Sequence, residues 1–468
     1  MNYKLLINGE SVDSTTKLEV INPATGEVFD SCPSADGALL NEAVAAAKVA
    51  QLTWKKSLLS ERQRVLKEIA TSIANNREEL ARIITCEQGK TLDFSLFEVD
   101  AAQKFCEWFS NQEIPGKKVI EESELLRVEQ TRVPLGVVGC ITPWNFPLLQ
   151  AVYKIAPALL TGNAVVVKPA PTTPLSTLFL GQIIKGIVPA GLVNIVSGGN
   201  ELGALLSAHP DVAKISLTGS IETGKKVVSS SAGNLKKVTL ELGGNDAAIL
   251  LSDIDIAKVI PAVFATSFIN SGQVCIAIKR LYVPDEIYDD VCDALSELVK
   301  SAVVGDGLNP ESQFGPLQNA AQLSKFHHYL DLAKRDGNII ATSECPDSQG
   351  YFAPLILVRD ILDGTPLVDE EPFCPILPVI RYSSLDDVIY KANSMSFGLG
   401  GSVWSSDLDK AQAVAERLEC GTAWVNQHCA FAPNIPFGGI KQSGIGIEFG
   451  DEGILEFTDM KITSISKA

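Results

Sequence analysis

The stretch GVVGCITPWNFPLLQAVYKIAPALLTGNAVVVK, residues 136–168, decides the fold. An apolar run at 136–141 predicts a buried strand, the apolar segment 147–160 predicts a helix, and 164–167 predicts a second strand. Gly162 and Asn163 between helix and second strand are a typical helix stop. Strands that alternate in this way with helices of 10–15 residues form parallel βαβ units. The sequence therefore predicts an α/β fold built on a doubly wound parallel sheet.

The segments on either side extend this pattern. Upstream, apolar residues at helical spacing predict helices at 43–54, 61–75, 78–88 and near 96–109, with Gly89 as a stop, and 119–133 reads as an extended, charged ribbon. Downstream, the alternation continues to residue 240, and a second α/β region runs from 247 to about 421. The tail at 453–465 alternates apolar and polar residues, which predicts a strand that completes another lobe or a partner's sheet.

Composition excludes several classes of protein. The 468 residues include 39 basic and 56 acidic ones, a net charge of −17, which argues against nucleic acid or an anionic membrane as a partner. There is no uninterrupted apolar run of membrane-spanning length and the start lacks the features of a signal peptide. Ten scattered cysteines without a CxxC pair, and four histidines without a zinc pattern, indicate free thiols in a reducing cytoplasm and no metal site.

Three residues are candidates for catalysis from their local sequence. Cys275 follows a helical stretch and a glycine, where nearby backbone N–H groups favour a reactive thiolate, although a lone cysteine is also a common small core residue. Glu241 ends a predicted strand ahead of two glycines, as a general base or as a solvated loop residue. Asn145 lies between two prolines in a rigid strand-to-helix turn, which fixes an amide donor suited to an oxyanion.

Two further positions suggest phosphate and ribose contacts. Gly219 and Ser220 join a strand to a helix, so backbone N–H groups face an anion such as a pyrophosphate, or Ser220 is only a helix cap. Lys168 stands at another strand end, where it either bonds ribose hydroxyls or is an ordinary surface lysine.

Together these segments resemble the aldehyde dehydrogenase superfamily over nearly the whole chain. The motifs TPWNFP (142–147), KPAP (168–171), TGS (218–220), ELGG (241–244), GQVC (272–275) and EEPFCP (370–375) occur in the family's order. The resemblance implies two doubly wound parallel-sheet domains and a small β arm. The NAD(P)-binding domain is expected at 1–112 and 132–241, the catalytic domain at 242–450, and the oligomerisation arm of a homodimer or homotetramer at 113–131 and 451–468.

The resemblance also implies roles. Cys275 is expected to attack the aldehyde carbon, with the oxyanion held by the Asn145 amide and the Cys275 backbone N–H. Hydride transfer to the nicotinamide of NAD or NADP leaves a thioester, and Glu241 activates the water that hydrolyses it. Lys154 and Glu448 match positions around this base.

The expected cofactor and substrate contacts follow from the same motifs. The cofactor positions are Thr142, Trp144, Lys168, Pro171, Gly219, Ser220, Leu242, Glu371 and Phe373. The substrate positions are Phe146, Tyr153, Val274, Ile276 and Phe431. Because the second set is apolar apart from one hydroxyl and contains no arginine, an aliphatic or aromatic aldehyde is favoured over a semialdehyde acid.

Two departures from the family pattern bear on the cofactor. Pro171 replaces a glutamate common in NAD-preferring members, so loss of a ribose acceptor and of like-charge repulsion predicts that NADP is tolerated. Cys374 replaces the usual glycine and is expected to add bulk near the nicotinamide end, with a redox role left open.

Three alternatives remain open at this point. A CoA-acylating semialdehyde dehydrogenase typically lacks the base at the Glu241 position, so the glutamate favours hydrolysis to a free acid. A non-catalytic protein on this scaffold conflicts with the intact Cys275, Asn145 and Glu241. A cysteine-dependent esterase would act without nicotinamide.

Overall fold

The predicted βαβ unit is present in the computed structural model, which describes residues 2–467. Strand β7 (Val137–Ile141), helix α5 (Pro147–Leu160) and strand β8 (Ala164–Lys168) follow one another, and β7 and β8 pair in parallel. Every residue of α5 is buried, which explains why its sequence has no polar stripe. Gly162, at a φ of +88°, turns the chain after the helix, and the Asn163 side chain accepts the Gly136 N–H at 2.9 Å.

The first large sheet is built around this unit. Its order is β19-β11-β10-β7-β8-β9-β1-β2; β11, β10, β7, β8 and β9 are parallel, and antiparallel strands close both edges. The remaining strands are β1 (Leu5–Ile7), β2 (Glu10–Val12), β9 (Val193–Ile195), β10 (Lys214–Thr218), β11 (Lys237–Glu241) and β19 (Gly444–Ile445).

The second large sheet is likewise mostly parallel, with only β14 antiparallel at one edge. In spatial order it contains β14 (Asn338–Thr342), β15 (Ile356–Arg359), β16 (Ile376–Tyr382), β13 (Ile278–Pro284), β12 (Asp246–Leu250), β17 (Gly400–Trp404) and β18 (Thr422–Val425). Separate apolar clusters cover its two faces, so both faces are buried as in doubly wound folds. The predicted fold class is confirmed.

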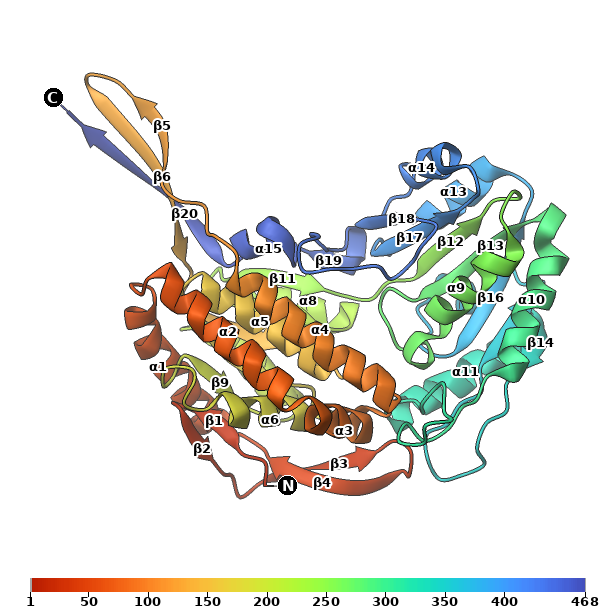
Figure 1. Ribbon diagram of the computed structural model, residues 1–468, viewed down its shortest axis with the longest axis horizontal. Helices are drawn as coiled ribbons and strands as arrows, with labels where there is room; N and C mark the ends of the chain where they lie inside the picture. The colour runs from red at the N-terminus through yellow and green to blue at the C-terminus, as the bar shows by residue number, and fades with distance from the viewer. Residues whose placement is uncertain (1, 468) are drawn as a thin grey trace.

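Helices pack around each sheet (Figure 1). The first unit contains α1 (Gly37–Trp54), α2 (Leu59–Asn75), α3 (Arg77–Gln88), α4 (Leu92–Ser110), α6 (Leu175–Ile184), α7 (Asn200–Ala208) and α8 (Ile221–Ser231). The second contains α9 (Ile256–Phe268), η1 (Ile269–Gly272), η2 (Asp285–Ile287), α10 (Tyr288–Ser301), α11 (Ala320–Asp336), α12 (Pro366–Asp369), α13 (Leu385–Asn393) and α14 (Leu408–Ala415), and η3 (Lys441–Ser443) lies near β19. A separate hairpin is formed by β3 (Lys17–Asn22) and β4 (Glu27–Pro33). No helix among residues 2–467 has the length and apolar character needed to cross a bilayer.

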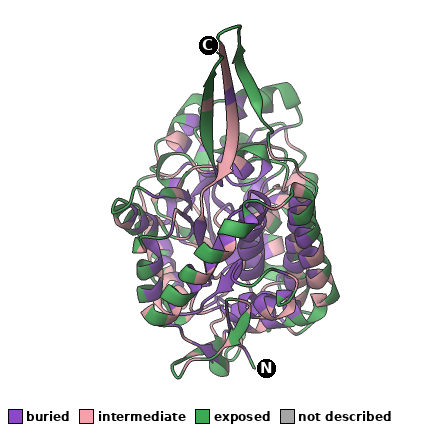
Figure 2. Cartoon of the chain, turned by 90° about the vertical axis from the view of Figure 1, so that its left-hand side faces the viewer, coloured by how far each residue is buried: buried purple, intermediate pink, exposed green. Residues whose placement is uncertain are grey.

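An antiparallel ribbon projects from the body and is largely exposed (Figures 1 and 2). It consists of β5 (Lys118–Glu122), β6 (Leu126–Pro134) and β20 (Thr458–Ser466). The expected arm segments 113–131 and 451–468 therefore need correction: β6 extends to Pro134, and residues 450–455 form helix α15 (Gly450–Leu455). Ile454 and Phe457 are buried in the core of the first unit, so the strand predicted from residue 453 begins only at Thr458.

The stop predicted at Gly89 also positions the site described below. Gly89 ends α3 with a φ of +98°, and a Cβ there would lie 2.9 Å from Cγ of Pro316. The tight turn brings Lys90, the next residue, into the interior between the two units, where it is 2% exposed.

Candidate functional site

The Cys275 loop is held between the two sheets by its backbone. Asn270, Ser271 and Gly272 all have positive φ angles, and a Cβ on Gly272 would lie 2.5 Å from the Cys374 carbonyl oxygen. The buried Lys279 ammonium donates to the carbonyls of Val274 at 2.9 Å and Cys275 at 2.6 Å. The loop therefore has little freedom, and the cysteine side chain has a fixed direction.

Cys275 lies at the junction of two cavities. The first, of about 120 Å³, is lined by Phe94, Phe97, Phe146, Leu149, Gln150, Tyr153, Ile269, Val274, Cys275, Ile276, Cys429, Phe431, Phe437 and Phe449. The second, of about 160 Å³, is lined by Pro143, Trp144, Asn145, Thr218, Gly219, Ser220, Leu242, Gly243, Cys275, Gln322, Lys325, Glu371 and Phe373. The thiol is the chemical group common to an apolar cavity and a more polar one.

Asn145 belongs to the first unit and reaches the Cys275 loop. Its Nδ2 donates to the Gln273 carbonyl at 3.0 Å, and its Oδ1 accepts from Gln150 Nε2 at 3.3 Å. These two bonds fix the amide orientation and leave one N–H of Nδ2 for another acceptor.

A buried ion pair supports Asn145 from behind. The Lys90 ammonium donates to the Asn145 carbonyl at 2.6 Å and to Glu98 at 2.7 Å. The other Glu98 oxygen accepts the N–H groups of Leu148 and Leu149 at the start of α5. Burial lowers the pKa of Lys90, and the Glu98 carboxylate counteracts this.

Glu241 ends β11 and is buried near Cys275. Neither carboxylate oxygen makes a hydrogen bond of good geometry with the residues that the structure describes, although the Gly439 backbone N–H approaches the carboxylate. Burial, and then the nearby Glu448 carboxylate, raise the pKa of Glu241 well above its usual range, while Lys154 and the Gly439 N–H act in the opposite direction. A weakly held carboxylate in this environment is a candidate base.

Lys154 and Glu448 form a second buried ion pair beside Glu241. The Lys154 ammonium bonds Glu448 Oε1 and donates to Ser216 Oγ at 3.1 Å. Glu448 is positioned by two backbone hydrogen bonds of 2.7 Å to Phe437. The structure thus brings Cys275, Asn145, Glu241, Lys154 and Glu448 into one region.

The electrostatics favour a neutral thiol in the absence of ligands. Burial raises the pKa of Cys275 to about 12, with Glu241 adding to the effect and the Lys279 ammonium opposing it. A base is therefore needed to generate the thiolate at neutral pH.

Most of the expected cofactor positions line the second cavity. They are Trp144, Gly219, Ser220, Leu242, Glu371 and Phe373. Thr142, Lys168 and Pro171 are not among its lining residues; Lys168 ends the neighbouring strand β8, and its carbonyl accepts the Thr142 N–H at 3.2 Å. Glu371 is held by the Gly244 N–H at 3.1 Å, and Trp144 packs edge-on against Phe373.

All five expected substrate positions line the first cavity. The sequence reasoning missed the other members, among them Phe94 and Phe97 on α4, Gln150 on α5, and Phe449 beside Glu448. It also missed Lys90, Glu98 and Lys279. These residues come to the site through packing. The apolar spacing of α4 was a local signal for its phenylalanines, but the same spacing is found in a cavity wall and in a core.

The expectation for Cys374 was wrong. Its side chain is 5% exposed and packs in one core of the second sheet, and it does not line either cavity. Its carbonyl, rather than its sulfur, faces the Cys275 loop at Gly272. The thiol therefore adds no bulk at the second cavity.

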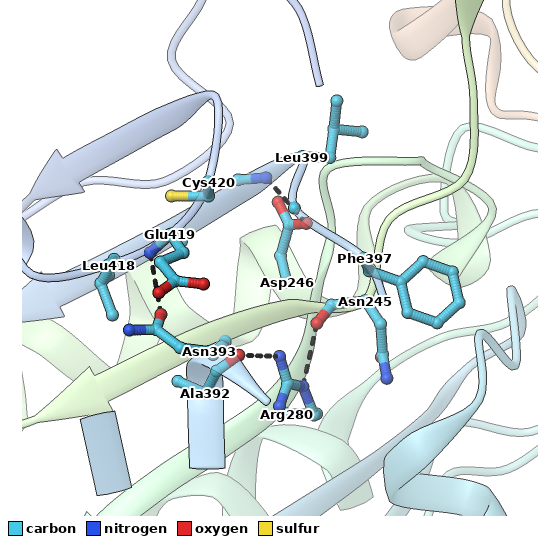
Figure 3. Close-up of a pocket in the computed structure, with 14 residues that line it drawn as sticks. Asn245, Asp246, Arg280, Ala392, Asn393, Phe397, Leu399, Leu418, Glu419 and Cys420 are labelled. Carbon is cyan, nitrogen blue, oxygen red and sulfur yellow. Dashed lines mark hydrogen bonds between the residues drawn. The ribbon is translucent and has the colours of Figure 1, made fainter. Parts of the chain in front are cut away.

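A third, smaller cavity lies where the chain passes into the second sheet (Figure 3). The Arg280 guanidinium donates to the carbonyls of Asn245 and Ala392, and Asp246 accepts the Gly400 N–H. Its volume of about 20 Å³ holds little more than a water molecule. This hydrogen-bond network anchors the strand that follows Glu241 and Gly244.

Cys275 thus lies between an apolar cavity and a cavity at the carboxyl ends of β7, β10 and β11, the edge where open α/β sheets bind ligands. The aldehyde dehydrogenase family matches residues 10–463, and the chain belongs to this family. It is therefore an aldehyde dehydrogenase.

Named relatives match nearly the whole chain. Phenylacetaldehyde dehydrogenase from Pseudomonas fluorescens is 38% identical over 97% of this chain and 94% of its own length. Aldehyde dehydrogenase 1A1 from Mesocricetus auratus is 38% identical over 99% of this chain and 94% of its own length. A betaine aldehyde dehydrogenase mutant from Staphylococcus aureus, solved with NAD+ and a BME-modified cysteine, has a TM-score of 0.96 at 32% identity and covers 100% of this chain and 98% of its own.

The buried pair behind Asn145 gives a testable prediction about stability. Lys90→Met leaves the Glu98 carboxylate buried without its cation and should lower the free energy of unfolding by about 3–5 kcal/mol. The matched control is Arg64→Met, which breaks an exposed i,i+4 pair with Glu68 and should cost about 0.5 kcal/mol or less. Denaturant unfolding measures both, and equal losses would contradict the assigned importance of the buried pair.

Proposed function

We propose that this chain oxidises an aliphatic or aromatic aldehyde to the carboxylic acid with NAD+ or NADP+, through a thioester on Cys275 that is hydrolysed with Glu241 as general base. The observation that carries the proposal is the position of Cys275, which lines both cavities. One cavity is suited to an apolar aldehyde and the other to a nicotinamide. The aldehyde carbon, when bonded to the sulfur, would therefore lie next to the nicotinamide.

The oxyanion has two donors. When sulfur bonds the aldehyde carbon, the carbonyl oxygen gains negative charge, and the free N–H of Asn145 Nδ2 and the Cys275 backbone N–H can stabilise it. No acceptor is recorded for that backbone N–H within residues 2–467. The hydrogen bond from Lys90 to the Asn145 carbonyl holds this residue in place.

Glu241 is suited to take a proton from the water that attacks the thioester. Burial raises the pKa of Glu241 above that of an ordinary glutamate, so its carboxylate is a stronger proton acceptor. Taking a proton from water gives the hydroxide that attacks the thioester carbon, and the C–S bond then breaks to release the acid. The Lys154–Glu448 pair lies beside Glu241 and tunes its charge.

The second cavity fits a dinucleotide. The hydroxyl of Thr142, next to the cavity lining, is buried without a partner in the described part of the chain, and Gly219 and Ser220 precede the eleven-residue helix α8, whose N-terminus suits a pyrophosphate. A Cβ on Gly243 would lie 2.2 Å from Glu371 Oε2, so there is no room for a side chain at this position. Glu371 and Phe373 would orient the nicotinamide ribose. When bound, the nicotinamide accepts the hydride from the former aldehyde carbon.

The first cavity favours an apolar, ring-bearing substrate. Seven of its lining side chains are aromatic: Phe94, Phe97, Phe146, Tyr153, Phe431, Phe437 and Phe449. The lining contains no arginine or lysine to pair with a second carboxylate. The similarity to a phenylacetaldehyde dehydrogenase points in the same direction.

The proposal predicts the following substrate profile. Reduction of NAD+ or NADP+, followed at 340 nm, should occur with phenylacetaldehyde, and kcat/KM should exceed that for succinic semialdehyde by about 10- to 100-fold because apolar burial favours the ring. Cys275→Ala should abolish the reaction, whereas Cys345→Ala, a cysteine outside both cavities, should retain it. A Cys275→Ala variant that still reduces the cofactor would overturn the assignment.

The raised pKa of Glu241 predicts a pH dependence. Since the carboxylate is the active form, steady-state turnover should rise with pH through the elevated pKa and fall as Glu241 is protonated at lower pH. Glu241→Gln should lose at least about 100-fold in turnover while one equivalent of reduced cofactor still forms in the first turnover. Wild-type turnover by Glu241→Gln would contradict the role of base, and release of acyl-CoA instead of free acid would favour the CoA-acylating alternative.

A further inference from the structure

The carboxyl ends of β8 and β9 form the part of the first sheet that lies next to the expected ribose position. The two strands pair in parallel, Lys168 is the last residue of β8, and helix α7 begins shortly after β9. Ligands of open α/β sheets bind at such adjacent carboxyl ends. The inference below rests on the proposed binding of a nicotinamide dinucleotide at this edge.

Lys168 packs against the beginning of α7. A Cβ on Gly203 would lie 3.5 Å from Cδ and 3.6 Å from Cε of Lys168, so the helix covers the lysine stem. The ammonium donates to the Pro169 carbonyl at 3.1 Å, and the side chain is almost completely buried. Burial lowers the pKa of Lys168 to about 8, and the charged group that opposes this shift is Glu201.

Glu201 is the second residue of α7 and is exposed. Its Oε2 lies 2.7 Å from the position of a Cβ on Gly199, so the carboxylate turns back over the loop that joins β9 to α7. The carboxylate forms no ion pair with Lys168 but is close enough for its charge to act on the ammonium, and it lies over the loop that follows β9. At position 171, where an acceptor for the ribose was expected, the chain has a proline.

We propose that Glu201 supplies the carboxylate that position 171 lacks, and that it makes the enzyme select NAD+ over NADP+. With NAD+, the carboxylate accepts a hydrogen bond from the ribose 2′-hydroxyl. With NADP+, the 2′-phosphate meets a like charge. This reverses the expectation of NADP tolerance, which was drawn from Pro171 alone.

Two features that would favour a 2′-phosphate are weak here. The N-terminus of α7 carries a partial positive charge that attracts anions, but the Glu201 carboxylate in the first turn already offsets this charge. An arginine, which binds phosphate with two parallel hydrogen bonds, is absent from the segments 168–174 and 196–203. Within these two segments Lys168 is the one basic residue, and the charge of Glu201 acts on it.

Calorimetric titration of NAD+ and NADP+ into the Cys275→Ala protein tests the proposal without relying on turnover. NAD+ should bind at least 10-fold more tightly than NADP+. Adding Glu201→Gln should bring the two dissociation constants within about threefold, chiefly through tighter binding of NADP+. The matched control is Glu222→Gln, which removes an exposed acid from the second position of the next helix, α8, and should leave the ratio unchanged.

Each outcome separates this inference from the proposed function. Equal affinities in the parent protein, or a ratio that Glu201→Gln does not change, would overturn the role of Glu201 while leaving the dehydrogenase proposal intact. Binding of neither dinucleotide by folded protein would overturn the cofactor proposal and this inference with it.

Discussion

The hydrogen bond from Asn145 Nδ2 to the Gln273 carbonyl joins the two halves of the site. Asn145 follows a strand of the first sheet, whereas Gln273 belongs to the loop that presents Cys275 from the second unit. Gln273 is also fixed on its other side, because its Oε1 accepts the Gln318 N–H at 2.9 Å, and Gln318 in turn donates to the Glu87 carbonyl of α3. The distance between sulfur and oxyanion donor therefore depends on contacts between units.

Buried charge is concentrated around the same point. Two lysine–glutamate pairs, Lys90–Glu98 and Lys154–Glu448, lie inside the protein, and each has additional hydrogen bonds that offset desolvation. Glu241 differs from these pairs, since it has no cation bonded to it and only the Gly439 backbone N–H approaches its carboxylate. Such a weakly held buried carboxylate can take a proton readily, at a cost in stability that the large cores offset.

The sequence pattern correctly predicted those elements that depend on residues close together in the chain. The βαβ unit at 136–168, the helix stop at Gly89 and the ribbon near 119–133 follow from apolar spacing and glycine, and the family motifs point to the residues that line the two cavities. The tail shows the limit of such patterns: residues 453–455 alternate like a strand but are helical, because Ile454 and Phe457 are packed into the first core. Lys90 reaches the site only through a tertiary contact with Asn145, so no motif could reveal it. Cys374 was misplaced because the sequence does not show which way its side chain turns.

The central claim is that the acyl group is carried by Cys275 and released by Glu241. The most direct test is to incubate Glu241→Gln protein with phenylacetaldehyde and NAD+, digest it, and determine by mass spectrometry which peptide carries a phenylacetyl group. The account predicts nearly stoichiometric acylation of Cys275, which is lost when Cys275→Ala is added. Formation of reduced cofactor with Cys275 unmodified, or acylation at another residue, would contradict it.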